Sequence, residues 1–300
     1  MVIDKIITLA NERVRLQLNV LIRSLRNVGC DLPVWVIPYD DRTTFQLPEG
    51  CQWWANEELY QWIGRHGLSG NHRQFQTLTT SNFQYADVDI VFLADPRGVL
   101  ESHTGLVTAD TEWSKPFNVA VEHSKALYAK ESSTWMLQRF NAGQFALDRK
   151  LYESTELIET AESENCAATC IGSKQHAQPG VNLLVHQKGV KTTNLTLAPH
   201  NLQSTWAGDY PGEYDSIWGR RGQPYLIHYA GESIPYRDLP INRLFKEYLS
   251  SSERVEWEVQ CEDKLEMLKR KYSPPPIHKR ILHRLRPIWN RLLFQANRNT

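Results

Sequence analysis

The chain has 300 residues, enough for one large α/β domain or two small ones with a well-buried sheet. Its hydrophobic share of 41% and aromatic share of 10% exclude an intrinsically disordered chain. No run approaches the roughly eighteen apolar residues of a membrane-spanning helix, and the formal net charge is zero. The opening lacks an apolar run of signal length and the five cysteines are scattered, so we expect a cytoplasmic protein.

The first forty residues have the pattern of a βαβ unit. Residues 3–9 predict a short buried strand, and apolar side chains from Val14 to Leu25 recur at spacings of three and four, as in a helix. The helix should end near Gly29, and residues 33–37 predict a second strand. Such a unit predicts a parallel sheet with a right-handed crossover. The sequence has neither a G-x-G-x-x-G fingerprint nor a P-loop, which argues against the nucleotide sites those motifs form.

The rest of the chain continues this α/β pattern. Further strands are predicted at 90–93, 117–121, 143–147, 181–185 and 225–228, and helices at 151–164, 239–249 and 253–271. A proline run at 273–276 breaks the chain before a last predicted helix at 277–295. We therefore expect a mixed, mainly parallel sheet flanked by helices at 1–250, a helical connector at 251–272 and a separate tail at 273–300.

Two aspartates mark the edge of the strand at 90–93. Asp87 and Asp89 are two residues apart where the chain turns, so that both carboxylates can address one hard divalent cation. Mn²⁺ or Mg²⁺ would share its remaining coordination positions with phosphate oxygens. The alternative is a solvated pair of turn aspartates with no ligand.

Residues 85–96, Tyr-Ala-Asp-Val-Asp-Ile-Val-Phe-Leu-Ala-Asp-Pro, resemble the metal-binding segment of GT-A glycosyltransferases. They are most similar to the family-eight group, which includes glycogenin and bacterial lipopolysaccharide galactosyl- and glucosyltransferases. Three further segments follow in the family's order: 140–147 resembles its Phe-Asn-Ser-Gly strand, 178–182 its Gln-Asp-x-Leu-Asn segment, and 228–236 its late His-x-x-Gly-x-x-Lys-Pro-Trp. The resemblance spans about residues 3–245 and implies the GT-A fold.

The resemblance also implies a metal-bound nucleoside diphosphate sugar as donor. Asp87, Asp89 and His228 would be the metal ligands, because a neutral imidazole can complete a site begun by two carboxylates. The alternative for His228 is a structural histidine in the core. The other residues that the resemblance implies are Gln178, Asn141 and Asn182 around the reacting sugar, and Gly143 and Gly231 along the donor.

The chain departs from the family pattern at the diphosphate. Ile234 stands where the family has a lysine that pairs with it, Tyr236 replaces a tryptophan, and Ala177 and Pro179 flank Gln178. A missing lysine removes a charge that would stabilise the leaving group. Arg237 or a residue of another loop is then expected to provide it; the alternative is a low affinity for the donor.

Further donor contacts are expected near the first strand and before the metal motif. Thr8, Ala10 and Asn11 end the first strand, where an open α/β sheet offers its ligand crevice. Arg73 stands where family members place a cation that faces the donor; the alternative is a surface arginine on a polar helix.

The tail is strongly basic. Residues 269–300 contain nine Lys or Arg and no acid, whereas the preceding 268 residues contain 25 basic and 34 acidic residues. An apolar stripe from Ile281 to Leu293 predicts a basic amphipathic helix that binds an anionic membrane surface. The alternative is a helix docked on the body or on another subunit of a homo-oligomer. Without a recognition motif and with an acidic body, we expect no nucleic-acid partner.

These features together predict a glycosyltransferase. It would move a hexose from a nucleoside diphosphate sugar, UDP-linked by the resemblance, to a hydroxyl of a glycan, a lipid-linked acceptor or a protein, with retention of the anomer. Two alternatives stay open. One is a sugar nucleotidyltransferase, although the N-terminal loop lacks the expected glycines, and the other is a non-catalytic protein of the same fold.

Overall fold

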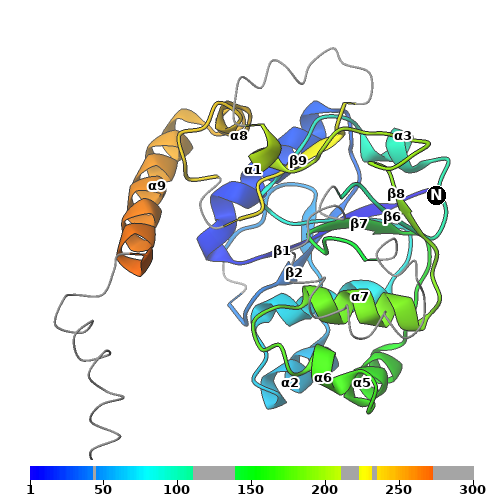
Figure 1. Cartoon of the computed structure of the whole chain (residues 1–300). Helices are drawn as coiled ribbons and strands as arrows, with labels where there is room; N and C mark the ends of the chain where they lie inside the picture. Colours follow the sequence, from blue (N-terminus) through cyan, green and yellow to red (C-terminus); the bar gives the residue numbers. More distant parts are fainter. Residues whose placement is uncertain (43–44, 111–138, 211–222, 232–234, 273–300) are drawn as a thin grey trace, which may run out of the picture.

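The computed structural model describes residues 1–42, 45–110, 139–210, 223–231 and 235–272 (Figure 1). Its main sheet has seven strands in the order β3-β2-β1-β4-β7-β6-β8. They are β1 Lys5–Ala10, β2 Val34–Pro38, β3 Cys51–Trp53, β4 Phe83–Ala86, β6 Leu106–Thr108, β7 Gln144–Leu147 and β8 Thr192–Asn194. The first four strands run parallel, β7 is antiparallel to β4 and β6, and β8 is parallel to β6. The prediction of a mixed, mainly parallel sheet is confirmed.

A small second sheet lies beside the main one. It pairs β5 Ile90–Phe92 with β9 Leu226–His228 in antiparallel register. The helix α1 Arg15–Asn27 packs on it through the predicted apolar stripe, and Val20 shares a core cluster with Val91. The hydroxyl of Ser24 accepts a hydrogen bond of 3.0 Å from the backbone N–H of Phe92. These contacts fix the strand that follows the two aspartates.

The face of the main sheet that is turned away from α1 is covered by a layer of helices (Figure 1). It contains α2 Glu57–Arg65, the 3₁₀ segment η2 Gly70–Thr79, α5 Ser154–Glu162, α6 Ala167–Cys170 and α7 Gln178–Gln187. Their apolar side chains bury Phe83 and Phe145 of the sheet in one core. The shorter elements are η1 Glu12–Val14, α3 Pro96–Leu100, η5 Ala207–Asp209 and α8 Asn242–Lys246.

Some predicted elements differ from the structure. The strand predicted at 181–185 was wrong, because these residues belong to α7. A short apolar run does not distinguish a buried strand from a buried helix, and Pro179 in the first turn favours the helix. The helices predicted at 151–164 and 239–249 are present but shorter. The predicted elements at 117–121 and 277–295 lie outside the described residues.

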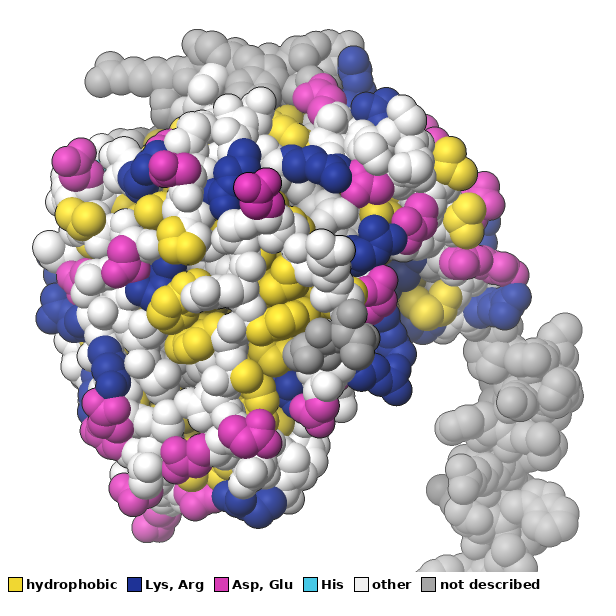
Figure 2. Space-filling model, turned by 180° about the vertical axis from the view of Figure 1, so that it is seen from behind, with side chains coloured by type: hydrophobic (Ala, Val, Ile, Leu, Met, Phe, Trp, Pro, Cys, Tyr) yellow, Lys and Arg dark blue, Asp and Glu magenta, His cyan; other side chains and the backbone are white. Residues whose placement is uncertain are grey.

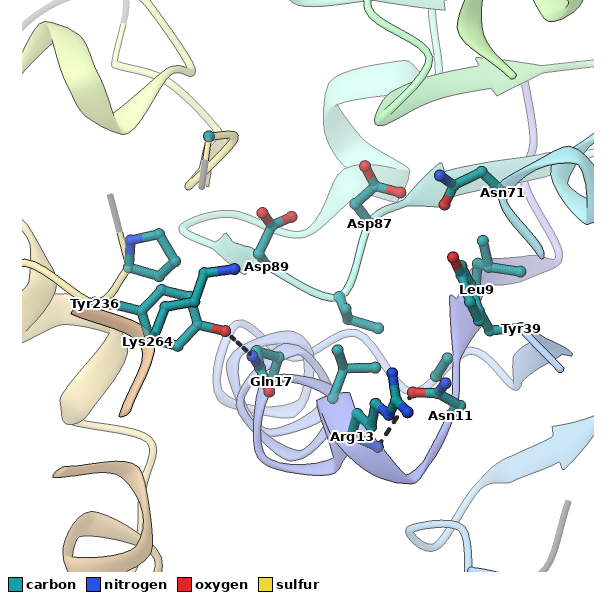
Figure 3. Close-up of a pocket in the computed structure, with 15 residues that line it drawn as sticks. Leu9, Asn11, Arg13, Gln17, Tyr39, Asn71, Asp87, Asp89, Tyr236 and Lys264 are labelled. Carbon is teal, nitrogen blue, oxygen red and sulfur yellow. Dashed lines mark hydrogen bonds between the residues drawn. The ribbon is translucent and has the colours of Figure 1, made fainter. Parts of the chain in front are cut away.

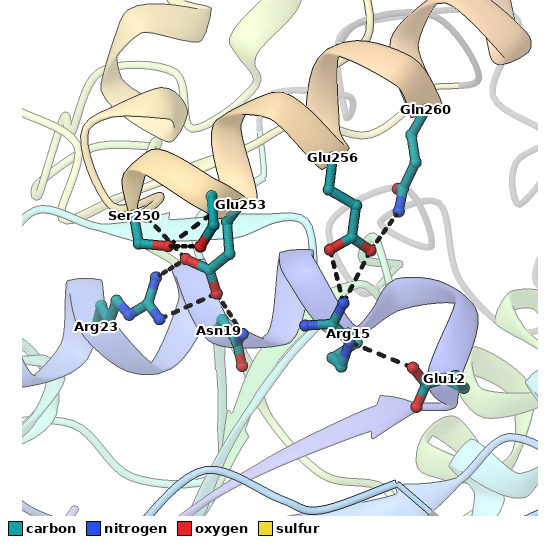
Figure 4. Close-up of polar contacts among 9 residues, drawn as sticks. Glu12, Arg15, Asn19, Arg23, Ser250, Glu253, Glu256 and Gln260 are labelled. Carbon is teal, nitrogen blue, oxygen red and sulfur yellow. Dashed lines mark hydrogen bonds and ion pairs between the residues drawn. The ribbon is translucent and has the colours of Figure 1, made fainter.

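The long helix α9 Ser251–Tyr272 packs against α1 (Figure 4). Glu253 forms an ion pair with Arg23 and accepts a hydrogen bond of 2.7 Å from Asn19, and Glu256 lies 2.8 Å from Arg15. Burial raises the pKa of Glu253, but the hydrogen bonds from Arg23, Ser250 and Asn19 together lower it to about 2. Trp257 is buried in the core cluster that includes α1 residues. Residues 251–272, predicted as a helical connector, form α9, which contacts α1 through these groups.

The surface of the described residues has no single dominant charge in the view of Figure 2. Basic and acidic side chains are interspersed over this face, and apolar side chains gather near its centre. Within the described residues, no helix has the length and apolar character needed to cross a membrane.

Candidate active site

The two aspartates lie at the junction of the two sheets. Asp87 follows β4 directly, and its backbone N–H donates a 2.8 Å hydrogen bond to the carbonyl of Gly143 at the start of β7. Asp89 precedes β5, and its carbonyl accepts a 2.9 Å hydrogen bond from Tyr229 after β9. Because Ile90 pairs with His228 in the β5–β9 ladder, this register brings the histidine alongside the aspartates.

The three side chains form one compact group of ligand atoms. The Nε2 atom of His228 lies 3.2 Å from an oxygen of Asp89 and 3.7 Å from an oxygen of Asp87. One ligand atom from each residue lies within 4.8 Å of the others, and no other such group of three occurs in the described part of the chain. Two carboxylates and an imidazole are a donor set that suits Mn²⁺ or Mg²⁺. The residues therefore fit the implied metal.

Asp87 and Asp89 are only partly buried, but their carboxylates lie close together, which is costly without a cation. Burial of Asp87 and the negative charge of Asp89 raise the pKa of Asp87 above its ordinary range, and His228 and the Tyr85 hydroxyl only partly offset this. The Tyr85 hydroxyl donates a 2.8 Å hydrogen bond to Oδ1 of Asp87, which leaves Oδ2 on the side of His228. A bound divalent cation would remove the repulsion between the carboxylates.

Gly143 lies directly behind the ligands. A methyl group in place of its hydrogen would come within 2.3 Å of Cε1 of His228 and 2.6 Å of Oδ2 of Asp87. The Oδ1 atom of Asn141 accepts a 2.8 Å hydrogen bond from the backbone N–H of Gly143 and holds this approach. Any side chain at this position would overlap the side chains of Asp87 and His228 unless they moved.

A cavity of about 410 Å³ opens beside the aspartates, at the carboxyl ends of β1 and β4 (Figure 3). This is where open α/β sheets bind ligands. A smaller hollow of about 310 Å³ adjoins it and includes His228, Asn141 and Gln178. Asp87, Asp89 and Gly231 line both spaces, so the candidate metal site lies between two ligand-sized hollows.

The structure brings most of the predicted site residues to these hollows. Ala10 and Asn11 line the larger one. The Asn11 amide donates a 2.9 Å hydrogen bond to Asp40. Asn141, Gly143 and Gln178 line the smaller one, where Oε1 of Gln178 accepts a 3.1 Å hydrogen bond from the backbone of Ala142.

Other predicted residues lie elsewhere. Thr8 is fully buried within β1, and Arg237 is exposed and lines neither hollow. Arg73 lines neither hollow. It is buried, donates a 3.0 Å hydrogen bond to the carbonyl of Pro38, and pairs with Asp41. Desolvation favours a partner for such a charge, and Asp41 is that partner.

Asn182 is also not in the hollows. Its buried amide accepts a 2.7 Å hydrogen bond from the backbone of Phe140 and donates to the carbonyls of Phe140, at 2.9 Å, and Gln178, at 3.0 Å. It therefore joins α7 to the segment that carries Asn141. Its hydrogen bonds position this segment, and its side chain lines neither hollow.

Several lining residues were not predicted. Tyr39, Asn71, Arg13 and Lys264 line the larger cavity, and His176 lines the smaller one. Tyr39 follows β2 and is brought beside β1 by the parallel register of these strands. The polar end of the second predicted strand was the only signal for it in the sequence. Lys264 belongs to α9, which has many charged residues, and the sequence does not indicate which of its lysines would face a cavity.

Comparisons with known proteins give matches among solved structures only. No protein-family model matches the chain, and no curated protein matches its sequence. Among solved structures, the galactosyltransferase LgtC in complex with donor and acceptor sugar analogs superposes with a TM-score of 0.51 at 13% identity, over 83% of this chain and 99% of that chain. The apo form of the glycosyltransferase GlyE from Streptococcus pneumoniae TIGR4 has a TM-score of 0.49 at 13% identity, over 88% and 64%.

The bifunctional glycosyltransferase WbbM has a TM-score of 0.47 at 12% identity, over 88% of this chain and 51% of that chain. This chain thus spans about half of WbbM and just under two thirds of GlyE, but almost the full length of LgtC. The mixed seven-stranded sheet and its helical layers agree with the LgtC superposition. The chain therefore has the α/β GT-A fold, in a form that resembles the family-eight glycosyltransferases.

Proposed function

We propose that the chain is a metal-dependent glycosyltransferase. It transfers a hexose from a UDP-linked sugar donor to a hydroxyl group of a glycan, a lipid-linked acceptor or a protein. The observation that carries this proposal is the group of Asp87, Asp89 and His228 between two hollows at the carboxyl ends of β1 and β4. In this fold, that edge of the sheet is where a nucleotide would lie.

The two hollows suggest where each part of a nucleotide-sugar donor would bind. The base and ribose would occupy the larger cavity near Ala10, Asn11 and Tyr39, and the sugar would occupy the smaller one near Asn141 and Gln178. Asp87, Asp89 and His228 would hold Mn²⁺ or Mg²⁺, which serves as a Lewis acid on the departing diphosphate. The side chains around the leaving group are preorganised by the fold, which favours charge separation in the transition state. Retention of the anomer is proposed from the resemblance to family eight.

Calorimetric titration of UDP with and without Mn²⁺ tests the proposal. We expect UDP to bind only when Mn²⁺ is present, because phosphate oxygens would otherwise meet two unneutralised carboxylates. A panel of UDP-sugars should then include one that is hydrolysed slowly in a Mn²⁺-dependent manner. Metal-dependent UDP binding without hydrolysis or transfer for any donor would favour a non-catalytic protein. Equal UDP affinity with and without the metal would contradict the proposal.

We further propose that the tail at 273–300 attaches the protein to the cytoplasmic face of a membrane. Replacement of Arg280, Arg284, Arg286 and Arg291 by Gln should abolish sedimentation with anionic vesicles and leave UDP binding unchanged. Each basic residue near an anionic surface contributes about 1 kcal/mol, so the four together account for a large share of the binding free energy. The attraction should also weaken as salt is added. Unchanged sedimentation of the variant, or no sedimentation of the wild-type chain, would contradict it.

A further inference from the structure

One lysine side chain that lines the larger cavity comes from α9, a helix outside the layers that cover the main sheet. Lys264 of α9 lines the cavity together with Asp89, and its side chain points into it (Figure 3). Lys264 follows Trp257 by seven residues, a spacing that places both on one face of a helix. Because Trp257 is buried in the core, this face of α9 is turned toward the domain.

Aromatic packing holds the lysine at this position. Its Nζ atom lies 5.5 Å from the ring centroid of Tyr236, within the range of a cation–π contact. The Tyr236 ring stacks on Trp257 with centroids 5.0 Å apart, and its hydroxyl accepts a 3.1 Å hydrogen bond from Gln17 of α1. The ion pairs of Glu253 and Glu256 with α1 fix the first two turns of α9 on the domain (Figure 4).

A diphosphate bound at this site would be stabilised by a positively charged side chain such as Lys264. Asp87 and Asp89 carry together as much negative charge as a divalent metal carries positive charge, so the loaded metal site is close to neutral. A diphosphate bound there retains most of its own negative charge and needs additional positive groups. Among the described residues that line the larger cavity, Arg13 and Lys264 are the Lys or Arg side chains. Arg13 is exposed, whereas Lys264 is half-buried, where a charge interacts more strongly.

We propose that Lys264 binds the diphosphate of the donor, so that α9 forms part of the donor site. This proposal rests on the proposed function. It assigns to α9 the charge that Ile234 does not carry, and it gives a reason for the ion pairs that join α9 to α1. The ammonium group would contact phosphate oxygens only, and the base and ribose would remain with residues of β1 and β2.

The test compares UDP with uridine in the full-length protein in the presence of Mn²⁺. Lys264→Met should weaken UDP binding about 10- to 100-fold, the effect of losing one hydrogen bond to a charged group. Uridine, measured by ligand-observed NMR, should bind the variant as it binds the wild type, because it has no phosphate. Lys264→Arg should keep most of the UDP affinity. Lys269→Met serves as the matched control, because it removes the same charge from an exposed position of the same helix and should leave both ligands unaffected.

The outcomes separate this proposal from the one on which it rests. If the wild-type protein binds no UDP with Mn²⁺, both the proposed function and this role of Lys264 are wrong. If the wild type binds UDP and Lys264→Met binds it equally well, the proposed function stands and the role of Lys264 is wrong. Equal weakening of UDP and uridine, or equal effects of the variants at 264 and 269, would overturn the diphosphate contact as well.

Discussion

Asp89→Asn should weaken Mn²⁺-dependent UDP binding at least about 10-fold and abolish transfer, and the folded structure should persist. Loss of a residue that only orients a metal ligand costs about 10- to 100-fold in affinity, and loss of a ligand should cost no less. The backbone carbonyl of Asp89, which pairs with Tyr229, is unaffected by the change. Calorimetry with UDP and Mn²⁺, together with thermal unfolding, measures both effects.

The same substitution should not destabilise the metal-free protein. Asp89 raises the pKa of the neighbouring Asp87, which means that the two carboxylates repel each other when no cation is bound. Asparagine removes this repulsion, so the metal-free variant should unfold at the same temperature as the wild type or higher. Asp238→Asn is the control, because Asp238 is exposed and lines neither hollow. Retained metal-dependent binding in Asp89→Asn, or a large loss of metal-free stability, would argue for a structural role of Asp89.

Sequence patterns predicted those elements whose conformation depends mainly on residues close together in the sequence. The strand–helix–strand start was confirmed because alternation of apolar runs and a helical stripe is a property of neighbouring residues. The strand predicted at 181–185 was wrong because a short apolar run packs equally well in either form. Residues 181–185 are helical because of the side chains that surround them in the core. These side chains come from segments distant in sequence.

The candidate site was predictable only where the family's motifs carry it. Asp87, Asp89 and His228 were expected together from the resemblance, and the β5–β9 register does bring them together. Arg73 lies outside the site because Asp41 and a carbonyl of β2 attract it, and the sequence gives no sign of that pairing. Lys264 was not predicted because its direction depends on how α9 packs on α1.

Gly143→Ala should reduce metal-dependent turnover about 100-fold without changing any ligand. The added methyl group would lie 2.3 Å from Cε1 of His228 and 2.6 Å from Oδ2 of Asp87, well inside the roughly 3.5–4.0 Å of favourable carbon contacts. At least one ligand must therefore move by a large fraction of an ångström, and a misplacement of about 1 Å costs about 100-fold in rate. Turnover at saturating Mn²⁺ and the Mn²⁺ affinity should both fall.

The variant also separates a crowded metal site from a glycine needed by the backbone. Gly143 is not among the described glycines with a left-handed φ, so alanine introduces no backbone strain there, and overpacking should cost only about 1–3 kcal/mol of stability. Gly64→Ala is the matched control, because Gly64 lies in α2 with nothing within 4 Å of the added methyl group. Alanine is the better helix former by about 1 kcal/mol, so this control should be slightly more stable and fully active. If Gly143→Ala keeps its Mn²⁺ affinity, then Asp87 and His228 do not hold the metal in the arrangement that the structure gives them.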